Sequence, residues 1–223
     1  KRSDLEMKRI YYFIQSEDWG QTWTTVDGKP IELPLTTLYN DALVRDYQSM
    51  GRNCYIKDVN FDKDGNPVIL YLTSDNHLPG PEGGIRKWHT LHWDGKEWIE
   101  SQFTTSTHSY DSGSIWTDND KEWTVIIPSD EGPQPLGSGG EIVRWVSKNE
   151  GKTWKRAGTI TSGSERNHGY VEGFYAYWSD GNPDTLSPSR LYFYTKDGQV
   201  FQMPYDMSEE WCKPIPYCTE KRK

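Results

Sequence analysis

Two stretches of the chain repeat one pattern: residues 16–23 read SEDWGQTW, and residues 147–154 read SKNEGKTW. Both copies have Ser, Gly, Thr and Trp in the same positions, and each follows an apolar run. The Ser and Asp side chains of such a stretch hydrogen-bond the backbone of their own turn, and its glycine accepts the strained dihedral angle. A turn motif that occurs twice in one chain indicates a repeat architecture.

The composition favours an aromatic-rich β protein. Of the 223 residues only 34% are hydrophobic, yet 11 are Trp and 14 are Tyr. Flat rings are typical of strands and of sugar-stacking surfaces, although an aromatic core explains any single one of them equally well. The length suffices for one or two domains with a sizeable core.

Charge and cysteine content exclude some classes of protein. The formal net charge of -8 argues against nucleic acid as a partner. No apolar stretch approaches the roughly 20 residues that span a bilayer, and residues 1–13 lack the form of a signal peptide. The three cysteines form no zinc pattern, and pairing of Cys212 with Cys218 is left open.

Strand signals dominate the sequence. Short β-branched or aromatic runs bounded by Gly, Pro, Asp or Asn occupy residues 9–15, 67–73, 122–128, 141–146, 173–179 and 190–195. Hairpin turns are predicted at residues 61–68, 92–98, 117–123 and 194–201. Only residues 41–50 are compatible with a short helix. The sequence therefore predicts an all-β protein.

The predicted strands fall into groups of four, over residues 52–104, 110–158 and roughly 168–205. A period of about 40 to 50 residues is that of a propeller blade. Several runs lack alternation, as expected where neighbouring blades cover both faces, whereas a two-sheet sandwich would alternate more cleanly. We predict four-stranded antiparallel blades, with residues 1–223 forming a single β-propeller domain or the carboxyl-terminal part of one.

The repeated stretches resemble the Asp-box, the S-x-D-x-G-x-T-W motif of sialidase-like propellers that is also called the BNR repeat. In that family the box joins the last two strands of a blade, on the rim and away from the active centre. Residues 55–84, 107–116, 132–154 and 167–181 further resemble the fourth BNR-repeat family. That family belongs to bacterial carbohydrate-degrading systems, and related propellers include secreted or periplasmic polysaccharide lyases that act on uronic-acid polymers such as ulvan.

The position of the first box implies an incomplete ring. In the family the box follows three strands of its blade, but here only one predicted strand precedes residue 16. About three and a half blades are too few to close a ring. We expect an open ring with exposed strand edges, completed by a missing amino-terminal part or by another copy in a homo-oligomer.

The resemblance implies a lyase that acts by β-elimination. This reaction needs a group that neutralises the uronate carboxylate, a base for the adjacent proton and an acid for the leaving oxygen. Two H-x-Y pairs open successive predicted blades, and we predict that they are catalytic: His108 with Tyr110, and His168 with Tyr170. The alternative is that these histidines only cap strand ends.

Weaker candidates for substrate binding are His77, Lys57, Asn167 and Arg190. His77 lies on a long Gly/Pro loop, and such loops often carry function, although a plain surface loop is the favoured interpretation. Lys57 and Asp58 are expected to precede an inner strand and to face the channel, although a buried ion pair explains them equally well. We interpret His89 and His92 as packing residues, since they point to opposite faces of a strand. No metal-ligand spacing appears, and no cofactor is predicted.

Because of one departure from the family pattern, two alternatives to a lyase reaction are considered. After NH-x-Y we expect two arginines and a proline, but the chain reads Val171, Glu172 and Gly173. Arginine is the natural partner of a uronate carboxylate. Two alternatives are a glycan-binding propeller without catalysis and a sialidase-like hydrolase, although no arginine lies in a recognisable sialidase motif.

Overall fold

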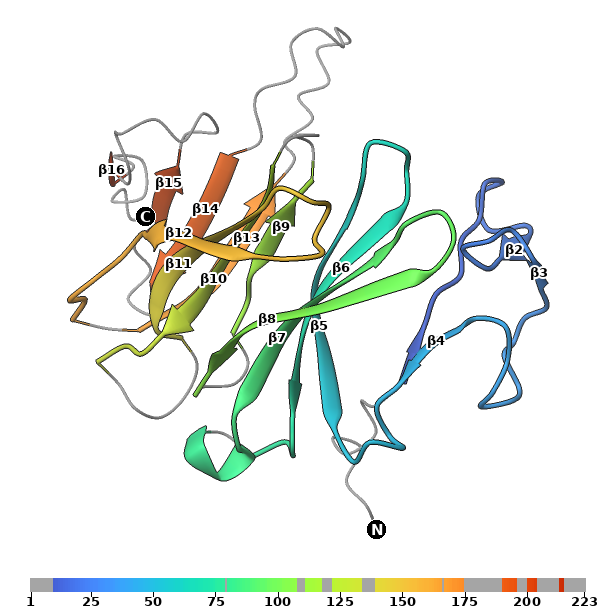
Figure 1. Ribbon diagram of the computed structural model, residues 1–223, viewed down its shortest axis with the longest axis horizontal. Helices are drawn as coiled ribbons and strands as arrows, with labels where there is room; N and C mark the ends of the chain where they lie inside the picture. The colour runs from blue at the N-terminus through green and yellow to red at the C-terminus, as the bar shows by residue number, and fades with distance from the viewer. Residues whose placement is uncertain are drawn as a thin grey trace, which may run out of the picture.

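The computed structural model describes residues 10–78, 80–107, 111–117, 122–133, 139–165, 167–174, 190–195, 200–203 and 213–214. In this part of the chain all the sheets are antiparallel, and the helical structure is the short 3₁₀ turn η2 (Gly80–Gly83). Figure 1 shows the sheets following one another from the amino-terminal strands to β16. No described helix is long and apolar enough to cross a membrane.

Three four-stranded sheets form the blades. The first contains β5 (Asn53–Phe61), β6 (Pro67–Ser74), β7 (Arg86–Trp93) and β8 (Trp98–Ser106) in sequential order. The second contains β9 (Ser114–Trp116), β10 (Trp123–Asp130), β11 (Glu141–Ser147) and β12 (Lys155–Thr159). The third contains β13 (His168–Phe174), β14 (Arg190–Thr195), β15 (Val200–Met203) and β16 (Lys213–Pro214). The predicted blades are confirmed.

The amino-terminal residues form only part of a blade. Strand β1 (Ile10–Tyr12) pairs with β4 (Leu43–Asp46), and β2 (Trp23–Thr24) pairs with β3 (Pro30–Ile31). A bridge between Gln15 and Thr24 joins the two pairs. The ring is not closed in this chain, as the position of the first box predicts.

Residues 41–50, the only stretch compatible with a short helix, do not form one. Residues 43–46 form β4, because their backbone pairs with β1 from Ile10 to Tyr12. Asn40 starts this strand by accepting a hydrogen bond from the Ala42 N–H at 3.0 Å. Pairing with a distant strand overrides a weak local helix pattern here, as tertiary contacts commonly do. The strand predicted at 173–179 corresponds to β13, which begins earlier, and residues 175–179 lie outside the described residues.

Both faces of the first blade are covered. Every residue of β6 is buried, with Val68, Leu70 and Leu72 in the core shared with the second blade. The alternate residues Ile69 and Tyr71 lie in a second core with Tyr11 and Tyr47. The unbroken apolar run of β6 therefore has the cause that the sequence suggests, because a neighbouring sheet packs on each side.

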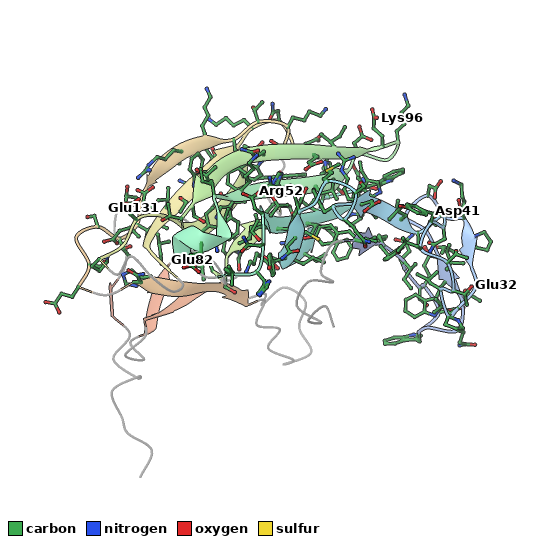
Figure 2. The ribbon with its side chains drawn as sticks, turned by 90° about the horizontal axis from the view of Figure 1, so that it is seen from below. Glu32, Asp41, Arg52, Glu82, Lys96 and Glu131 are labelled. Carbon is green, nitrogen blue, oxygen red and sulfur yellow. The ribbon has the colours of Figure 1, made fainter. Side chains whose placement is uncertain are left out.

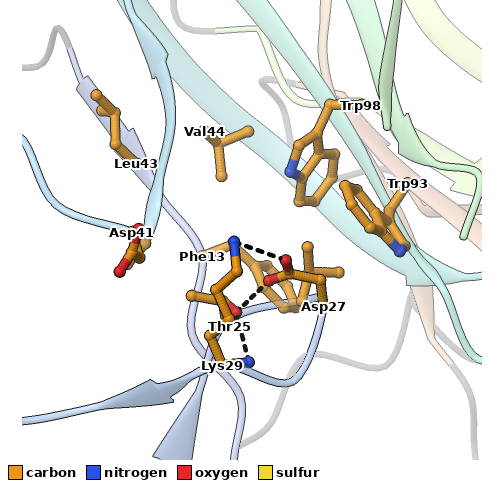
Figure 3. A pocket seen from close by; sticks show the side chains of 11 residues that line it. Phe13, Thr25, Asp27, Lys29, Asp41, Leu43, Val44, Trp93 and Trp98 are labelled. Carbon is orange, nitrogen blue, oxygen red and sulfur yellow. Dashed lines mark hydrogen bonds and ion pairs between the residues drawn. The ribbon is translucent and has the colours of Figure 1, made fainter. Parts of the chain in front are cut away.

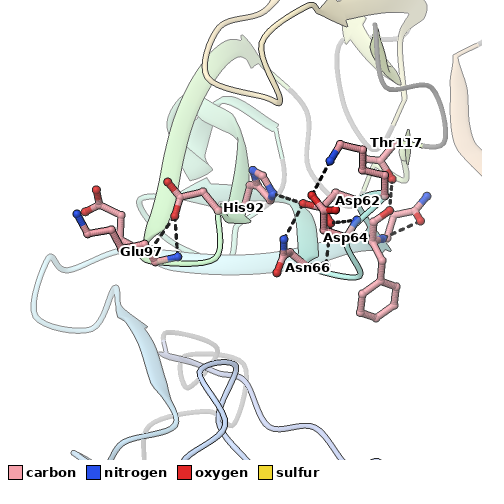
Figure 4. Close-up of polar contacts among 11 residues, drawn as sticks. Asp62, Asp64, Asn66, His92, Glu97 and Thr117 are labelled. Carbon is pink, nitrogen blue, oxygen red and sulfur yellow. Dashed lines mark hydrogen bonds and ion pairs between the residues drawn. The ribbon is translucent and has the colours of Figure 1, made fainter.

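The predicted hairpin turns are found where the structure describes them. Asp62 closes the β5–β6 turn by accepting hydrogen bonds from the N–H groups of Asp64 at 2.9 Å and Asn66 at 2.8 Å. Gly65 takes a positive φ of 82° in this turn. Figure 4 shows that the same carboxylate reaches His92 on β7, whose Nε2 lies at 2.8 Å. His92 is thus a packing residue, as predicted, and its ring meets Trp123 of the second blade edge-on.

The two repeated stretches adopt one turn. In each, two successive residues have positive φ: Trp19 and Gly20 in the first box, Glu150 and Gly151 in the second. The Ser Oγ accepts the glycine N–H, at 2.7 Å in the first box and 2.9 Å in the second. The second box joins β11 to β12, the last two strands of its blade, as the resemblance implies.

The box tryptophans do not both pack onto their own blade. Trp154 donates from Nε1 to the Thr90 Oγ1 of β7 at 3.0 Å, and its ring lies 5.4 Å from that of Phe103 on β8. Trp154 therefore connects its blade to the preceding one. Trp23 instead donates to Gly20 O within its own turn, at 3.2 Å.

Candidate functional site

The first strands of successive blades run in the same direction. Asp58 on β5 accepts a hydrogen bond from the Ile115 N–H of β9 at 2.9 Å, and further along both strands Thr117 Oγ1 donates to Phe61 O. Parallel first strands place their starts at the same end of the blades. Antiparallel pairing within each blade brings the second-to-third strand connection to that end too. We call this end the loop face; its described connecting residues are 75–78, 80–85, 107, 111–113, 131–133, 139–140, 160–165 and 167.

The connections of the second and third blades meet on the loop face. Gly140 and His168 exchange backbone hydrogen bonds of 3.0 and 3.1 Å, so the β10–β11 connection pairs with the start of β13. The fully buried Asp111, which precedes β9, accepts the Gly139 N–H. Asn167 is also fully buried, and its Oδ1 would lie 2.2 Å from a Cβ placed on Gly132. Glycine at 132 is therefore needed for this close approach.

His168 lies in a polar group with Glu141 and Ser164. Ser164 Oγ is 2.9 Å from Glu141 Oε2 and 2.9 Å from His168 Nε2, and the Ser164 N–H donates to Glu141 Oε1 at 2.7 Å. A hydroxyl has one proton, and here it is donated to the carboxylate. Consequently His168 Nε2 carries a proton and donates to Ser164 Oγ. This is the reverse of a serine nucleophile, whose hydroxyl donates to the histidine.

Glu141 stays ionised in this group. Burial acts to raise its pKa, but hydrogen bonds from Thr161 and Ser164 and the charge of a protonated His168 lower the pKa below its ordinary value. Because the ionised carboxylate accepts the hydroxyl proton of Ser164, the Ser164 oxygen is left to accept from His168 Nε2. The group is thus arranged to keep a proton on His168 and to offer it to an acceptor that displaces Ser164.

Arg52 lies on the loop face of the first blade, directly before β5. Its Nη1 is 3.1 Å from Asp75 Oδ1, while its buried Nη2 has no hydrogen-bond partner among the described residues. The side chain is 21% exposed. Figure 2 labels Arg52 and Glu82 on this blade and Glu131 on the next. Because part of this side chain is exposed and a guanidinium pairs well with carboxylates, Arg52 is a candidate to contact a carboxylate ligand.

The loop that carries His77 is held from inside by Arg86. The guanidinium of Arg86 is fully buried, donates to Gly84 O at 2.6 Å and also reaches Leu78 O. His77 itself is half-buried at the surface of this loop. Arg86 therefore holds in place the loop on which His77 lies.

Lys57 and Asp58 occupy the middle of β5 rather than its start. The register with β6 shifts between Ile56 and Asp58, so Lys57 is the inserted residue, and its Nζ lies 5.9 Å from the Tyr55 ring centre. Burial raises the pKa of Asp58 to about 6, although the N–H groups of Ile115 and Val59 and the Ser114 hydroxyl oppose the shift. Asp58 bonds to the next blade, so it does not form the ion pair with Lys57 that we considered.

The predicted site residues are only partly brought together. Asn167 and His168 share the loop face with Asp111, Glu141 and Ser164, whereas His77 lies on the same face of the first blade. Tyr170 follows on β13 opposite Tyr194, and Arg190 pairs with Phe174 at the far end of that sheet from His168. His108 and Tyr110 lie outside the described residues. No three His, Cys, Asp or Glu side chains of the described part gather as a metal site requires.

Sequence reasoning missed Arg52, Glu141 and Ser164. Arg52 precedes β5 directly, just as Asn167 precedes β13. Comparison of the residues that open each blade would therefore have singled it out. Glu141 and Ser164 are 23 positions apart and meet only through the pairing of β11 with β12. No local motif indicates that pair.

These strands define the class of the protein: a propeller with radially packed four-stranded blades. A family model described as BNR repeat-containing family member matches residues 2–106, which confirms the resemblance noted above. Two solved structures of PL25 ulvan lyase, a polysaccharide lyase, are similar to the chain. One is bound to -[GlcA(1-4)Rha3S]- and aligns with a TM-score of 0.53 and 14% identity; the other has a TM-score of 0.52 and 15% identity.

The extent of these matches is limited. Each alignment covers 86% of this chain but 41% of the lyase, so the chain spans about two fifths of the length of these structures. At such identities the likeness establishes the propeller fold and nothing finer. None of the curated proteins matches the chain.

Proposed function

We propose that this chain is part of a carbohydrate-active propeller, a polysaccharide lyase that cleaves uronic-acid-containing glycans by β-elimination. The observation that carries the proposal is the loop face, where the partly exposed guanidinium of Arg52 and a histidine whose Nε2 donates to Ser164 lie on blades of one propeller. A solved neighbour with the same fold holds a glucuronate-containing glycan. The site thus supplies groups of the kind that elimination from a uronate requires.

Each step of the reaction has a candidate residue. Arg52 would pair with the uronate carboxylate, and His77 of the same face would be a further contact to the glycan. Of the other residues predicted to bind substrate, Asn167 is fully buried, and Lys57 and Arg190 lie away from the loop face, so they are not assigned a contact there. A base removes the proton next to the carboxylate, the electron pair forms the C=C bond, and the glycosidic oxygen leaves with a proton. His168 is suited to donate that proton, because Glu141 and Ser164 keep Nε2 protonated. Tyr170, His108 and Tyr110 are the candidates for the base.

Incubation with acidic polysaccharides tests the activity directly. The elimination product absorbs ultraviolet light through its new C=C bond, and neither hydrolysis nor binding creates that chromophore. We expect product from a polymer of glucuronate and rhamnose, and a loss of at least about a hundredfold in rate for His168→Asn. The matched control is His92→Asn, which removes a buried histidine bonded to Asp62 far from the loop face. Equal rates for both variants would contradict a catalytic role for His168.

A glycan-binding propeller without catalysis is the second candidate. The chain has Val171 and Glu172 where the family has arginines, and loss of a carboxylate partner affects elimination more than binding. Retention of the polymer by the protein without new absorbance would favour this candidate. Release of a reducing sugar without absorbance would instead favour a sialidase-like hydrolase.

We further propose that strands from outside residues 1–223 cover the inner edge of the first blade. Ile56, Val59 and Phe61 of β5 are 53%, 45% and 52% exposed, beside the core where β1 and β4 already pack on this sheet. Exposed apolar rows of this kind mark an interaction surface. The mass of the isolated chain in solution tests where the covering strands come from. A dimer that dissociates on Val59→Lys indicates that a second copy supplies them, and a monomer indicates that they belong to further residues of the same chain.

A polymeric substrate also implies where the protein acts. Polysaccharides of this kind do not cross membranes, so we propose that the protein is secreted or periplasmic. Fractionation of cells that produce the natural full-length protein checks this, and recovery with the cytoplasm would contradict it.

A further inference from the structure

A pocket lies between the amino-terminal strands and the β7–β8 hairpin, away from the loop face. Its volume is about 160 Å³. Figure 3 shows Trp93 and Trp98 on one side, Leu43 and Val44 above, and Asp27 and Lys29 across from them. The volume is smaller than the roughly 300–1,000 Å³ of sites for drug-sized ligands, so it suits a single ring.

Three aromatic rings form an apolar corner of this pocket. The ring centres of Trp93 and Trp98 are 5.7 Å apart with planes at 62°, and those of Phe13 and Trp98 are 5.7 Å apart at 64°. All three side chains are half-buried, so each is held in place and still offers part of its surface to a ligand. Rigid amphipathic rings of this kind give contact area at little cost in entropy.

Polar groups face the aromatic corner. Lys29 Nζ is 3.0 Å from Asp27 Oδ2, and Thr25 Oγ1 accepts the Lys29 N–H at 3.0 Å and donates to Asp27. Asp41 is exposed and takes part in none of the hydrogen bonds or ion pairs found in the described part of the chain. Two carboxylates and one ammonium leave the pocket with a net charge of about -1 at neutral pH.

We propose that this pocket binds one neutral sugar ring, such as an unsubstituted pyranose, as a second carbohydrate site. The apolar face of the ring would lie against Trp93 and Trp98, and its hydroxyls would donate to Asp41 and accept from Lys29. A uronate is disfavoured, because its carboxylate would approach a net negative pocket. The site would hold the neutral residues of a glycan while the loop face takes the charged one, and it does not depend on lyase activity.

Ligand titrations followed by saturation-transfer NMR test the site. The probes are a methyl glucopyranoside, glucuronate and tetramethylammonium, the last because aromatic corners also bind cations. We expect the neutral glycoside to bind more tightly than either ion. Trp93→Ala should weaken its binding about tenfold. Tighter binding of either ion would overturn the proposal.

Two further variants separate a built site from general stickiness. Trp19→Ala is the matched control, since this tryptophan is fully exposed on the first box turn and does not line the pocket. It should leave glycoside binding unchanged, and an equal loss in Trp19→Ala and Trp93→Ala would overturn the proposal. Asp41→Asn removes one negative charge and should raise the affinity for glucuronate severalfold. No gain would contradict the proposed basis of selectivity.

Discussion

The two faces of the first blade are covered in opposite ways. Toward the second blade the centre of the contact is apolar, since Val68, Leu70 and Trp88 pack against Ile115 and Val125, and its hydrogen bonds involve no ion pair among the described residues. Toward the amino-terminal strands the contact is polar and centred on Glu100. Its Oε1 accepts hydrogen bonds from the hydroxyls of Tyr47 and Tyr71, both at 2.9 Å, and its Oε2 pairs with Arg45. We call these the dry junction and the wired junction.

A carboxyl group in each junction shows the difference most plainly. At the wired junction burial acts to raise the pKa of Glu100, but bonds from His89, Arg45 and the tyrosines lower the pKa to about 2. At the dry junction neutral donors cannot offset burial, and the pKa of Asp58 rises to about 6. The same fold thus joins neighbouring sheets either by apolar packing or by a charged hydrogen-bond network. Removal of one member destabilises the charged network in particular, because it leaves another buried charge without its partner.

The largest effect is expected at the dry junction. Trp88 is fully buried, and its Nε1 donates to Ser106 Oγ at 3.2 Å. Trp88→Ala should lower the free energy of unfolding by about 3–5 kcal/mol, because a large cavity opens between two blades. Denaturant titration measures this change, with the exposed Trp19→Ala as the control. A loss below about 1 kcal/mol would show that the two blades are not packed as described.

The next effect concerns the wired junction. Glu100→Gln should cost about 2 kcal/mol near neutral pH, because Arg45 loses its ionic partner and the tyrosine hydroxyls lose a charged acceptor. The folded pKa is lowered, so the stabilisation by Glu100 is present above its ordinary pKa of about 4.5 and is lost as pH falls toward about 2. The free energy of unfolding, measured between pH 2 and 7, should therefore depend more steeply on pH in the natural chain than in Glu100→Gln. Parallel curves would contradict the network.

Ionisation of Asp58 should change the stability with pH in the opposite direction to that of Glu100, and by a smaller amount. Its folded pKa is raised, so its contribution is largest below the unfolded pKa of about 3.8 and is lost as pH rises through about 6. We expect a change of about 1–2 kcal/mol between pH 4 and 7 that is missing in Asp58→Asn. The difference in unfolding free energy between the natural chain and Asp58→Asn, plotted against pH, isolates the contribution of Asp58. The same pH dependence in both proteins would show that Asp58 ionises normally.

The sequence was enough for the fold but not for the wired junction. The box turns, the hairpins and the unbroken apolar run of β6 each have a local cause, and together they predict the blades. Glu100 gave no such signal, since its partners Arg45, Tyr47 and Tyr71 are 29 to 55 positions away. The strand β4 that carries Arg45 was not among the predicted strands, because its pairing with β1 is also distant in sequence.

The candidate site was predictable to a similar degree. Asn167 and His168 were predicted because they open a blade, a position that can be inferred from the grouping of strands. The proton arrangement around His168 depends on Glu141 and Ser164, which the register of β11 and β12 brings together. Such register-dependent contacts are not written in any short motif.

The smallest effect compares the two box tryptophans, one at a junction and one outside. Trp154 donates across the dry junction to Thr90, whereas Trp23 donates only to Gly20 in its own turn. Trp154→Phe should therefore cost about 1 kcal/mol, because buried Thr90 loses a hydrogen-bond partner. Trp23→Phe should change the free energy of unfolding by no more than about 0.5 kcal/mol.

Thr90→Val removes the other end of the hydrogen bond from Trp154, so the double variant with Trp154→Phe should lose less stability than the sum of the two single losses. Equal costs for the two tryptophans, with additive losses at Thr90, would mean that the second box is a local turn like the first and does not join the blades.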